Sequence, residues 1–410
     1  MSWLLAPAAA RPVRLRSGCL TATPRRPRGA LARSRPLARM QEAELPGVTA
    51  SVLWAAFALA TAFGAIAQRT HFCTMGAVAD IVNIGDWTRM RMWAMAIGVA
   101  MLGFNAMVAA GWVQAANSIY AGPNLLWFSN IVGGLLFGVG MVLASGCGSK
   151  TLVRVGGGNL KSLVVLLVLA VAAYATMRGV LAVARAATLD AAAITLPSGQ
   201  DLPSLLAHAS GASRQTLALW LGGALGLALL GWGLSRPEGR SAEALLGGLG
   251  IGAVIVGVWW VSGRLGYVAE HPVTLEASFL ATNSRRMESL SFVAPVAYTM
   301  DWLILFSDTS RVLTLGIVSV FGVVLGSAVV ARMSGSFRWE GFAGTEDTAN
   351  HIAGAALMGA GGVTAMGCTI GQGLSGVSTL ALGSFLALGG ILAGGVLGLR
   401  YQTWRVERSL

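Results

Sequence analysis

One segment of the sequence occurs twice, and this repeat limits what the chain can fold into. The first copy, residues 133–147, reads GGLLFGVGMVLASGC, and the second copy, residues 354–368, reads GAALMGAGGVTAMGC. At a constant offset of 221 in the numbering, eight of the fifteen positions are identical, including the Gly-Cys pair that ends each copy. Each copy predicts an apolar, glycine-striped helix that breaks beside a thiol and continues into a loop rich in glycine, serine and threonine. A membrane protein built from two such halves places its site between them.

The apolar composition indicates an all-α polytopic membrane protein. The chain is 55% hydrophobic and only 11% charged, whereas soluble domains carry about 25% charged residues. A soluble helical bundle is the alternative, but it could not bury so many long apolar runs. Nine stretches are near the length that a bilayer requires: 48–66, 92–110, 128–146, 160–184, 214–234, 244–262, 312–331, 350–367 and 377–399.

Two shorter apolar segments extend the repeat. Residues 71–84 and 291–306 match each other at an offset of 220, which pairs Cys73 with Val293. Each half then holds four spans and one short broken helix, and the span at 214–234 is left as a linker that crosses the membrane. Four spans return the chain to its starting side, so the second half is expected to be inverted relative to the first. Inverted repeats are the plan of many transporters.

These observations divide the chain into five regions. The predicted boundaries are a basic N-terminal tail at 1–47, a first repeat at 48–185, an insertion and linker helix at 186–243, a second repeat at 244–400 and a C-terminal tail at 401–410. Residues 1–39 contain nine arginines and no acidic residue, which is typical of an organelle targeting peptide. The same stretch is also compatible with a spurious upstream extension and a start at Met40.

The distribution of Lys and Arg predicts the orientation, because cytoplasmic loops carry an excess of them. If the N-terminus of the body lies outside, the inner side holds thirteen cations and the outer side seven. We therefore expect the inner (plasma) membrane of a cell, with the N-terminus outside and the C-terminus in the cytoplasm. If the tail is a transit peptide, the membrane would be that of an organelle.

Three cysteines lie beside predicted helix breaks: Cys73, Cys147 and Cys368. The fourth, Cys19, lies in the tail. The sequence has no CxxC motif and no Cys/His pair at metal-ligand spacing, so no metal site is expected. A lone membrane cysteine is often only a small buried hydrophobe, but two of these three occupy equivalent repeat positions. A neutral thiol is a weak donor and a polarisable partner for sulfur, which favours a soft, sulfur-bearing anion.

Other residues near the breaks are candidates for binding that anion. Backbone N–H groups at broken helix ends attract anions, which points to Gly146 and Gly367. Lys150 and Arg154 would attract the anion electrostatically, although they also fit as ordinary positive-inside charges. The polar candidates, each of which could instead be a cap or loop residue, are Gln372, Ser375, Thr369, Asn159 and Ser162. Asp80 is expected to cap a helix or to pair with Arg69. No catalytic constellation, cofactor motif or Walker A motif is present.

These motifs resemble the YeeE/YedE sulfur-transport family of bacterial membrane proteins, which includes thiosulfate uptake transporters. The resemblance rests on FCTMGAVAD with Cys73, GMVLASGCGSKTLVRVGGGNLKSL with Cys147, and GGVTAMGCTIGQGLSG with Cys368. It implies that the three cysteines contact thiosulfate in turn by hydrogen bonding, without covalent turnover. Cys368 would be the outer contact, Cys147 the central one and Cys73 the innermost. Besides the anion and the lipid bilayer, a cytoplasmic sulfur-carrier protein is a candidate partner, and nucleic acid is not.

The sequence therefore predicts a transporter that imports thiosulfate or a closely related sulfur anion, and not an enzyme. One alternative is a transporter of another soft anion or of a selenium compound. A second alternative, from a different class, is a membrane redox or sulfur-transfer enzyme that forms persulfides. Such an enzyme needs a cysteine with a lowered pKa, and Lys150 near Cys147 is the one feature in the sequence that favours it.

Overall fold

The structure, a computed structural model, describes residues 30–271 and 274–409. The chain divides into two compact units, Met1–Glu44 and Leu45–Leu410. Most of the predicted tail, residues 1–29 with Cys19, lies outside the described residues. The second unit contains the predicted spans, the helix breaks and the three remaining cysteines.

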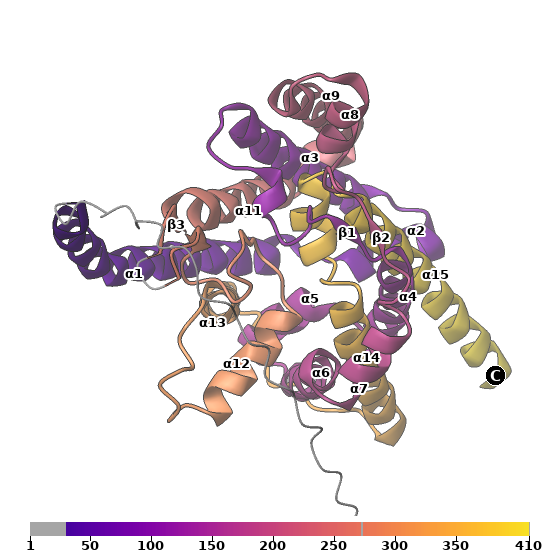
Figure 1. Cartoon of the computed structure of the whole chain (residues 1–410). Coiled ribbons are helices and arrows are strands. Elements are labelled where there is room, and N and C mark those ends of the chain that lie inside the picture. Colours follow the sequence, from indigo (N-terminus) through magenta and orange to yellow (C-terminus); the bar gives the residue numbers. More distant parts are fainter. Residues whose placement is uncertain (1–29, 272–273, 410) are drawn as a thin grey trace, which may run out of the picture. The chain divides into compact units, whose positions relative to one another are not determined.

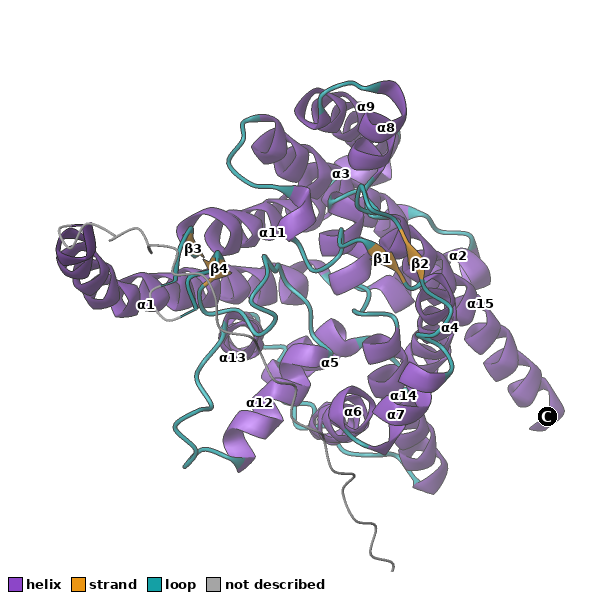
Figure 2. Cartoon of the chain, viewed as in Figure 1, coloured by secondary structure: helices purple, strands orange, loops and turns teal. Residues whose placement is uncertain are grey.

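The described part of the chain is almost entirely helical (Figures 1 and 2). The elements of the first half are α1 (Ala30–Thr70), α2 (Thr74–Ile84), α3 (Thr88–Ala109), η1 (Ala115–Asn117), β1 (Asn124–Leu125), α4 (Trp127–Leu143), α5 (Gly148–Gly156), α6 (Leu160–Arg178) and α7 (Val180–Ala187). Between the halves lie β2 (Ile194–Thr195), α8 (Leu202–Ser210), α9 (Arg214–Leu234) and η2 (Pro237–Arg240). The second half comprises α10 (Ala242–Leu245), η3 (Leu246–Gly250), α11 (Ile251–Trp260), η4 (Val261–Leu265), β3 (Tyr267–Val268), β4 (Ser278–Phe279), α12 (Ala294–Ile304), α13 (Leu315–Met333), α14 (Thr345–Thr364), η5 (Gly371–Gly376) and α15 (Leu382–Ser409).

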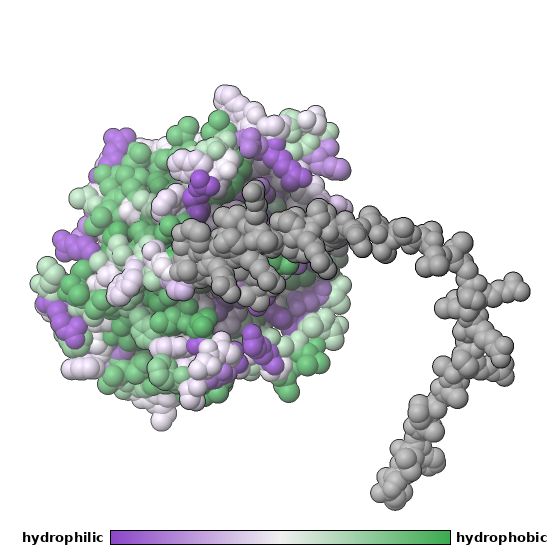
Figure 3. All heavy atoms as spheres, turned by 60° about the vertical axis from the view of Figure 1, so that its left-hand side comes forward, coloured by the Kyte–Doolittle hydropathy of each residue, from purple (hydrophilic) through white to green (hydrophobic). Residues whose placement is uncertain are grey.

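Eight helical stretches of the described chain are long and apolar enough to cross a membrane, which confirms the all-α polytopic fold. The ninth predicted span, 350–367, corresponds to the 20-residue helix α14, whose first turn carries Glu346 and Asp347 and makes it less apolar. Hydrophobic side chains also spread broadly over the outer face that Figure 3 shows. Large apolar side chains such as Trp54 and Trp220 are each 71% exposed, as lipid-facing residues are.

Some predicted spans differ in their ends. The predicted span 160–184 is two helices, because Gly179 leaves the helical conformation with extended backbone angles between α6 and α7. The predicted span 377–399 begins later, at Leu382, because a π-helical turn, η5, and a short loop precede α15. The two short segments form α2 and α12 as predicted, each 11 residues long and at positions that the repeat offset relates.

The repeated glycine-rich helices α4 and α14 pack directly against each other. A Cβ atom on Gly133 would lie 2.4 Å from the Ala365 backbone nitrogen, and one on Gly140 would lie 2.7 Å from the Gly354 carbonyl oxygen. Only glycine allows backbones to approach this closely. The offset of 221 maps the Gly133–Gly361 contact onto the Gly354–Gly140 contact, so each half contributes the same surface to this interface.

Helices of one half also pack on helices of the other. Helix α1 lies against α13, where a Cβ on Gly326 would meet the Thr61 carbonyl oxygen. Helix α3 lies against α11, where a Cβ on Gly252 would lie 2.6 Å from the Cβ atom of Val99. Helix α4 contacts α15 while α6 contacts α14, and these two contacts also exchange under the repeat. The core therefore lies between the halves, and the cysteines lie within it.

Candidate functional site

The two helix breaks have the same backbone conformation. After α4, Ser145 has a φ angle of 55°, and after α14, Met366 has a φ angle of 58°. The next amide closes each turn at the same distance, with Gly146 N donating to Met141 O and Gly367 N to Gly362 O, both at 2.8 Å. Left-handed conformations cost non-glycine residues about 1–3 kcal/mol, so the surrounding packing must hold both breaks in place.

Cys73 and Cys147 immediately precede short helices, and Cys368 lies three residues before the start of η5. Cys73 lies before α2, where its Sγ accepts a hydrogen bond from Gly76 N at 3.4 Å, and Cys368 Sγ accepts one from Gly371 N, also at 3.4 Å. Cys147 lies before α5 in an extended conformation, with its Sγ 3.3 Å from Ser149 Oγ. A thiol in this position lies beside the free N–H groups of a helix N-terminus, where an anion is favoured.

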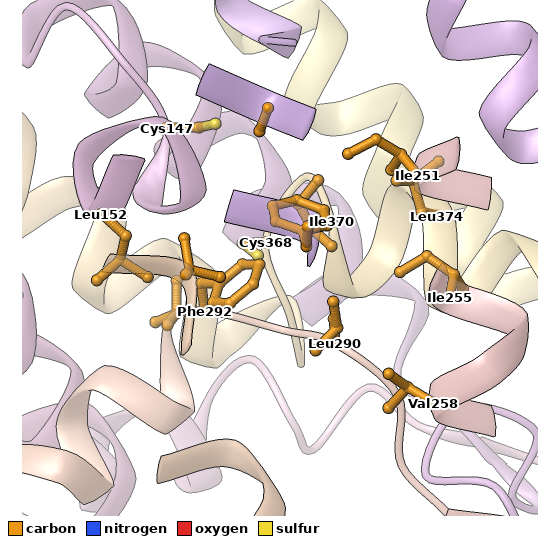
Figure 4. Packing of buried hydrophobic residues seen from close by; sticks show 14 of the residues in the cluster. Cys147, Leu152, Ile251, Ile255, Val258, Leu290, Phe292, Cys368, Ile370 and Leu374 are labelled. Carbon is orange, nitrogen blue, oxygen red and sulfur yellow. The ribbon is translucent and has the colours of Figure 1, made fainter. Parts of the chain in front are cut away.

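The cysteines form a buried series with Cys147 in the middle. Its thiol interacts with that of Cys73 and faces the hydroxyl of Thr369, the residue next to Cys368. Cys368 lies 4.0 Å from Ser291 Oγ on its other side. The exposed fractions of Cys73, Cys147 and Cys368 are 6%, 1% and 0%. Figure 4 shows Cys147 and Cys368 among packed apolar side chains, including Phe292 and Ile370. The structure is therefore closed around the thiols.

Polar side chains form hydrogen bonds to the backbone at the two breaks. Arg154 Nη1 donates to the Ser145 carbonyl oxygen at 2.7 Å, and Gln372 Nε2 donates to the Ala365 carbonyl oxygen at 2.5 Å. Each bond satisfies a carbonyl that the interrupted helix leaves free. Ser375 Oγ donates to the Leu290 carbonyl oxygen at 2.8 Å and so positions the segment that carries Ser291.

A cavity of about 450 Å³ opens beside the first break. We call it the basic cavity, because its lining includes Ser145, Lys150, Arg154, Lys161 and Arg338. Its two acidic side chains are both engaged. Asp347 pairs with Lys161 at 3.0 Å, and Glu340 accepts a hydrogen bond from Asn159 at 2.6 Å. The Ala343 amide and the Lys161 ammonium group lower the pKa of Asp347.

A second cavity, of about 250 Å³, opens beside the second break. We call it the Ser291 cavity, and Met366 and Gly367 belong to its lining together with Ser291. Glu288 also lines it, and burial raises the pKa of this carboxyl group although Ser284 donates to it. The cavities thus lie next to equivalent turns of the two halves, and Cys147 and Cys368 directly follow those turns.

The structure brings most of the predicted site residues to the breaks, but not all. Asn159 caps α6 by accepting from Ser162 N at 2.8 Å, so these two residues act as a helix cap at the edge of the basic cavity. The expected pairing of Asp80 with Arg69 is wrong. Asp80 pairs instead with Arg89 at 3.3 Å, because the turn after α2 brings the start of α3 back beside it.

Two further residues near the thiols are not among those predicted from the sequence. Ser291 occupies the repeat position equivalent to His71, so the offset of 220 was a signal that could have identified it. Tyr120 is 3% exposed, and its hydroxyl has no hydrogen-bond partner among the described residues. A Cβ on Gly371 would lie 3.2 Å from this hydroxyl, which places it near Cys368. No motif surrounds Tyr120 in the sequence.

The amino-acid sequence is similar to a known protein family and to two transporters. Residues 69–397 match the profile of the family described as "Sulphur transport". The chain is 27% identical over 320 residues to the thiosulfate transporter TsuA of Escherichia coli (strain K12), an alignment that covers 76% of this chain and 83% of that protein. It is 28% identical over 367 residues to the thiosulfate transporter TsuA of Spirochaeta thermophila, covering 82% of this chain and 94% of that protein.

Proposed function

Because the chain belongs to the sulphur transport family, we propose that it imports thiosulfate or a closely related sulfur anion past its three buried cysteines. The observation that carries this proposal is the pair of equivalent helix breaks, each bearing a cysteine and each adjoining its own cavity. The names of the two similar proteins support thiosulfate as the substrate.

The proposed route runs from the Ser291 cavity to the basic cavity. The anion enters beside Ser291 and meets Cys368, then Cys147, and then Cys73, before it reaches Lys150 and the other cations. Each thiol donates a hydrogen bond to the terminal sulfur of thiosulfate, which is soft and polarisable. Free amide groups at the N-termini of α2 and α5 stabilise the negative charge, whereas the amides of Gly146 and Gly367 already donate to Met141 O and Gly362 O and only shape the two turns. No covalent bond forms, so the cysteines end unchanged.

The closed arrangement requires a conformational change during transport. All three thiols are buried, so an anion reaches them only when packing around one break loosens. Gln372 and Arg154 hold the carbonyls at the two breaks, while Ser375 holds the segment before Ser291. We propose that these hydrogen bonds open alternately, first on one side and then on the other, as in other transporters with paired repeats.

Orientation and location belong to the same proposal. The excess of Lys and Arg would place the basic cavity in the cytoplasm and the Ser291 cavity outside, in the inner membrane of a bacterial cell. The regions 48–185 and 244–400 would be the inverted repeats, joined through 186–243. A cytoplasmic sulfur-carrier protein would be the natural acceptor of the anion beside the basic cavity.

A persulfide-forming enzyme is the rival, and mass spectrometry separates it from a transporter. Buried thiols with no open route favour hydrogen-bonded passage over turnover with a second protein substrate. We expect protein incubated with thiosulfate to keep its unmodified mass. A stable mass gain on Cys147 or Cys368 would support the enzyme.

Growth tests the function directly. The gene is expressed in a bacterial host that cannot take up sulfate, with thiosulfate as the sole sulfur source. We expect the wild-type gene to restore growth, and the Cys147→Ala gene, matched for membrane expression, to leave the host unable to grow. If wild-type protein reaches the membrane and growth still fails, the proposed substrate is wrong.

A further inference from the structure

The basic cavity carries a positive charge that the cysteine route alone does not require. Four cations line it, namely Lys150, Arg154, Lys161 and Arg338, as do two carboxylates, Glu340 and Asp347. With neutral histidines these groups leave a net charge of +2 from four positive and two negative side chains. Of the carboxylates, Asp347 pairs with Lys161, whereas no described carboxylate pairs with Lys150, Arg154 or Arg338.

The chemistry of this cavity differs from that of the cysteine series. Its described lining contains neither cysteine nor methionine, and its donors are ammonium, guanidinium, imidazole, hydroxyl and amide groups. Such donors recognise charge and oxygen atoms, and a sulfate ion offers both as well as thiosulfate does. A volume of about 450 Å³ also exceeds what one small dianion needs.

We propose that the basic cavity is a second anion site, which binds small divalent oxyanions without distinguishing thiosulfate from sulfate. It rests on the proposed function, since it lies at the end of the proposed route. The selective step then lies at the thiols, and the basic cavity receives whatever they pass on. Sulfate on this side occupies the cavity and blocks release of thiosulfate from Cys73 and Cys147. Uptake is therefore inhibited by sulfate from the inside and not by sulfate from the outside.

Two substitutions that change the charge of the basic cavity in opposite directions test whether its charge binds the anion. The Arg338 side chain is exposed and forms no ion pair with an acid among the described residues, so Arg338→Gln removes one positive charge while its backbone bond to Gly157 persists. Glu340→Gln removes one negative charge and keeps an oxygen for Asn159. Arg332→Gln is the matched control, because Arg332 stacks on Phe337 and lies outside the described lining of the cavity.

The measurement is thiosulfate uptake into proteoliposomes of controlled orientation, with sulfate inside and ionic strength matched by chloride. We expect internal sulfate to inhibit the wild type. Arg338→Gln should raise the half-inhibitory sulfate concentration roughly threefold, as removal of one solvent-screened charge does, and Glu340→Gln should lower it by a similar factor. Arg332→Gln should match the wild type, and external sulfate should have no effect on any of them.

Failure of this inference is distinguishable from failure of the proposed function. If wild-type protein takes up thiosulfate but internal sulfate has no effect, or acts equally on Arg338→Gln and Glu340→Gln, the second site does not exist. If no thiosulfate uptake occurs, the proposed function fails, and the site is tested by thermal unfolding of the purified protein. We then expect sulfate, but not ionic-strength-matched chloride, to raise the unfolding temperature, less so for Arg338→Gln, and equal shifts in both salts would overturn the site.

Discussion

At the scale of single residues, the cysteines are not equivalent. Cys147 and Cys368 occupy matching positions at the two breaks, whereas Cys73 pairs in the repeat with Val293, which is buried and 1% exposed. If the repeat alone set these residues, both positions would carry the same side chain. Because Cys73 interacts with Cys147, we infer that the proposed route is polarised, with an additional thiol on the side of the first half.

The substitution Cys73→Val tests this polarity. Valine is close to cysteine in volume and is apolar, so packing should change little. We expect thiosulfate uptake to fall to background while binding at Cys368 is largely kept, because Cys73 passes the anion on. Binding and uptake are measured on the same preparation. Near-normal uptake would reduce Cys73 to a packing residue and shorten the series to two thiols.

The sequence analysis singled out the three cysteines as site residues but missed several of the residues that surround them. Cys73, Cys147 and Cys368 stood out because each lies at a predicted helix break. Tyr120 did not, because it comes from a loop that only the fold brings beside η5. Lys150 and Arg154 were ambiguous in sequence, since a positive-inside charge and a site residue have the same local pattern. The cavity that joins them to Arg338, which lies in the other half of the chain, depends on tertiary packing.

At the scale of the helices, the α4–α14 interface holds the two breaks together. Its glycines leave no room for side chains, since the nearest atoms are backbone atoms of the facing helix. The sequence predicted these helices from their glycine stripe and apolar run. It could not predict that α6 would end at Arg178 or that a π-helical turn would precede α15. Both are local departures that the pattern of hydrophobic residues does not mark.

The substitution Gly140→Leu tests the interface. A Cβ at this position would lie 2.7 Å from the Gly354 carbonyl oxygen, so α4 and α14 must separate. We expect a loss of about 1–3 kcal/mol of stability, typical of overpacking, seen as a lower unfolding temperature of the purified protein.

Gly389→Leu is the control for that experiment. Gly389 lies in helix α15, and a Cβ there meets nothing within 4 Å. We expect its unfolding temperature to stay near that of the wild type. Equal unfolding temperatures for Gly140→Leu and Gly389→Leu would show that close packing of α4 on α14 is not needed.

At the scale of the whole molecule, the direction of transport depends on which cavity faces which side of the membrane. We predict that the C-terminal end lies in the cytoplasm. Tyr401 is 47% exposed near the end of α15, and Tyr401→Cys offers a site for a membrane-impermeant maleimide. We expect labelling only after the cells are permeabilised, relative to the wild type with its native cysteines. Labelling of intact cells would reverse the orientation and the direction of the proposed route.

The inverted repeat remains a prediction at this scale, although several structural features favour it. The break angles, the short helices α2 and α12 and the reciprocal glycine contacts all recur at offsets of 220 or 221 in the numbering. The sequence indicated the repeat because glycines recur where the backbones of α4 and α14 touch, and a cysteine follows each helix break. It did not indicate the cavities, which form only where the two halves meet.

We propose, above all, that this chain alone carries thiosulfate past buried thiols at two helix breaks. The sharpest test is uptake of radiolabelled thiosulfate into liposomes that contain only the purified protein, compared with Cys147→Ala and Cys368→Ala proteins at equal density and with normal insertion. We predict uptake by the wild type and background levels for both variants, because each removes the thiol donor that directly follows its break. No uptake by properly inserted wild-type protein, or wild-type rates in either variant, would show that the buried thiols do not carry the anion.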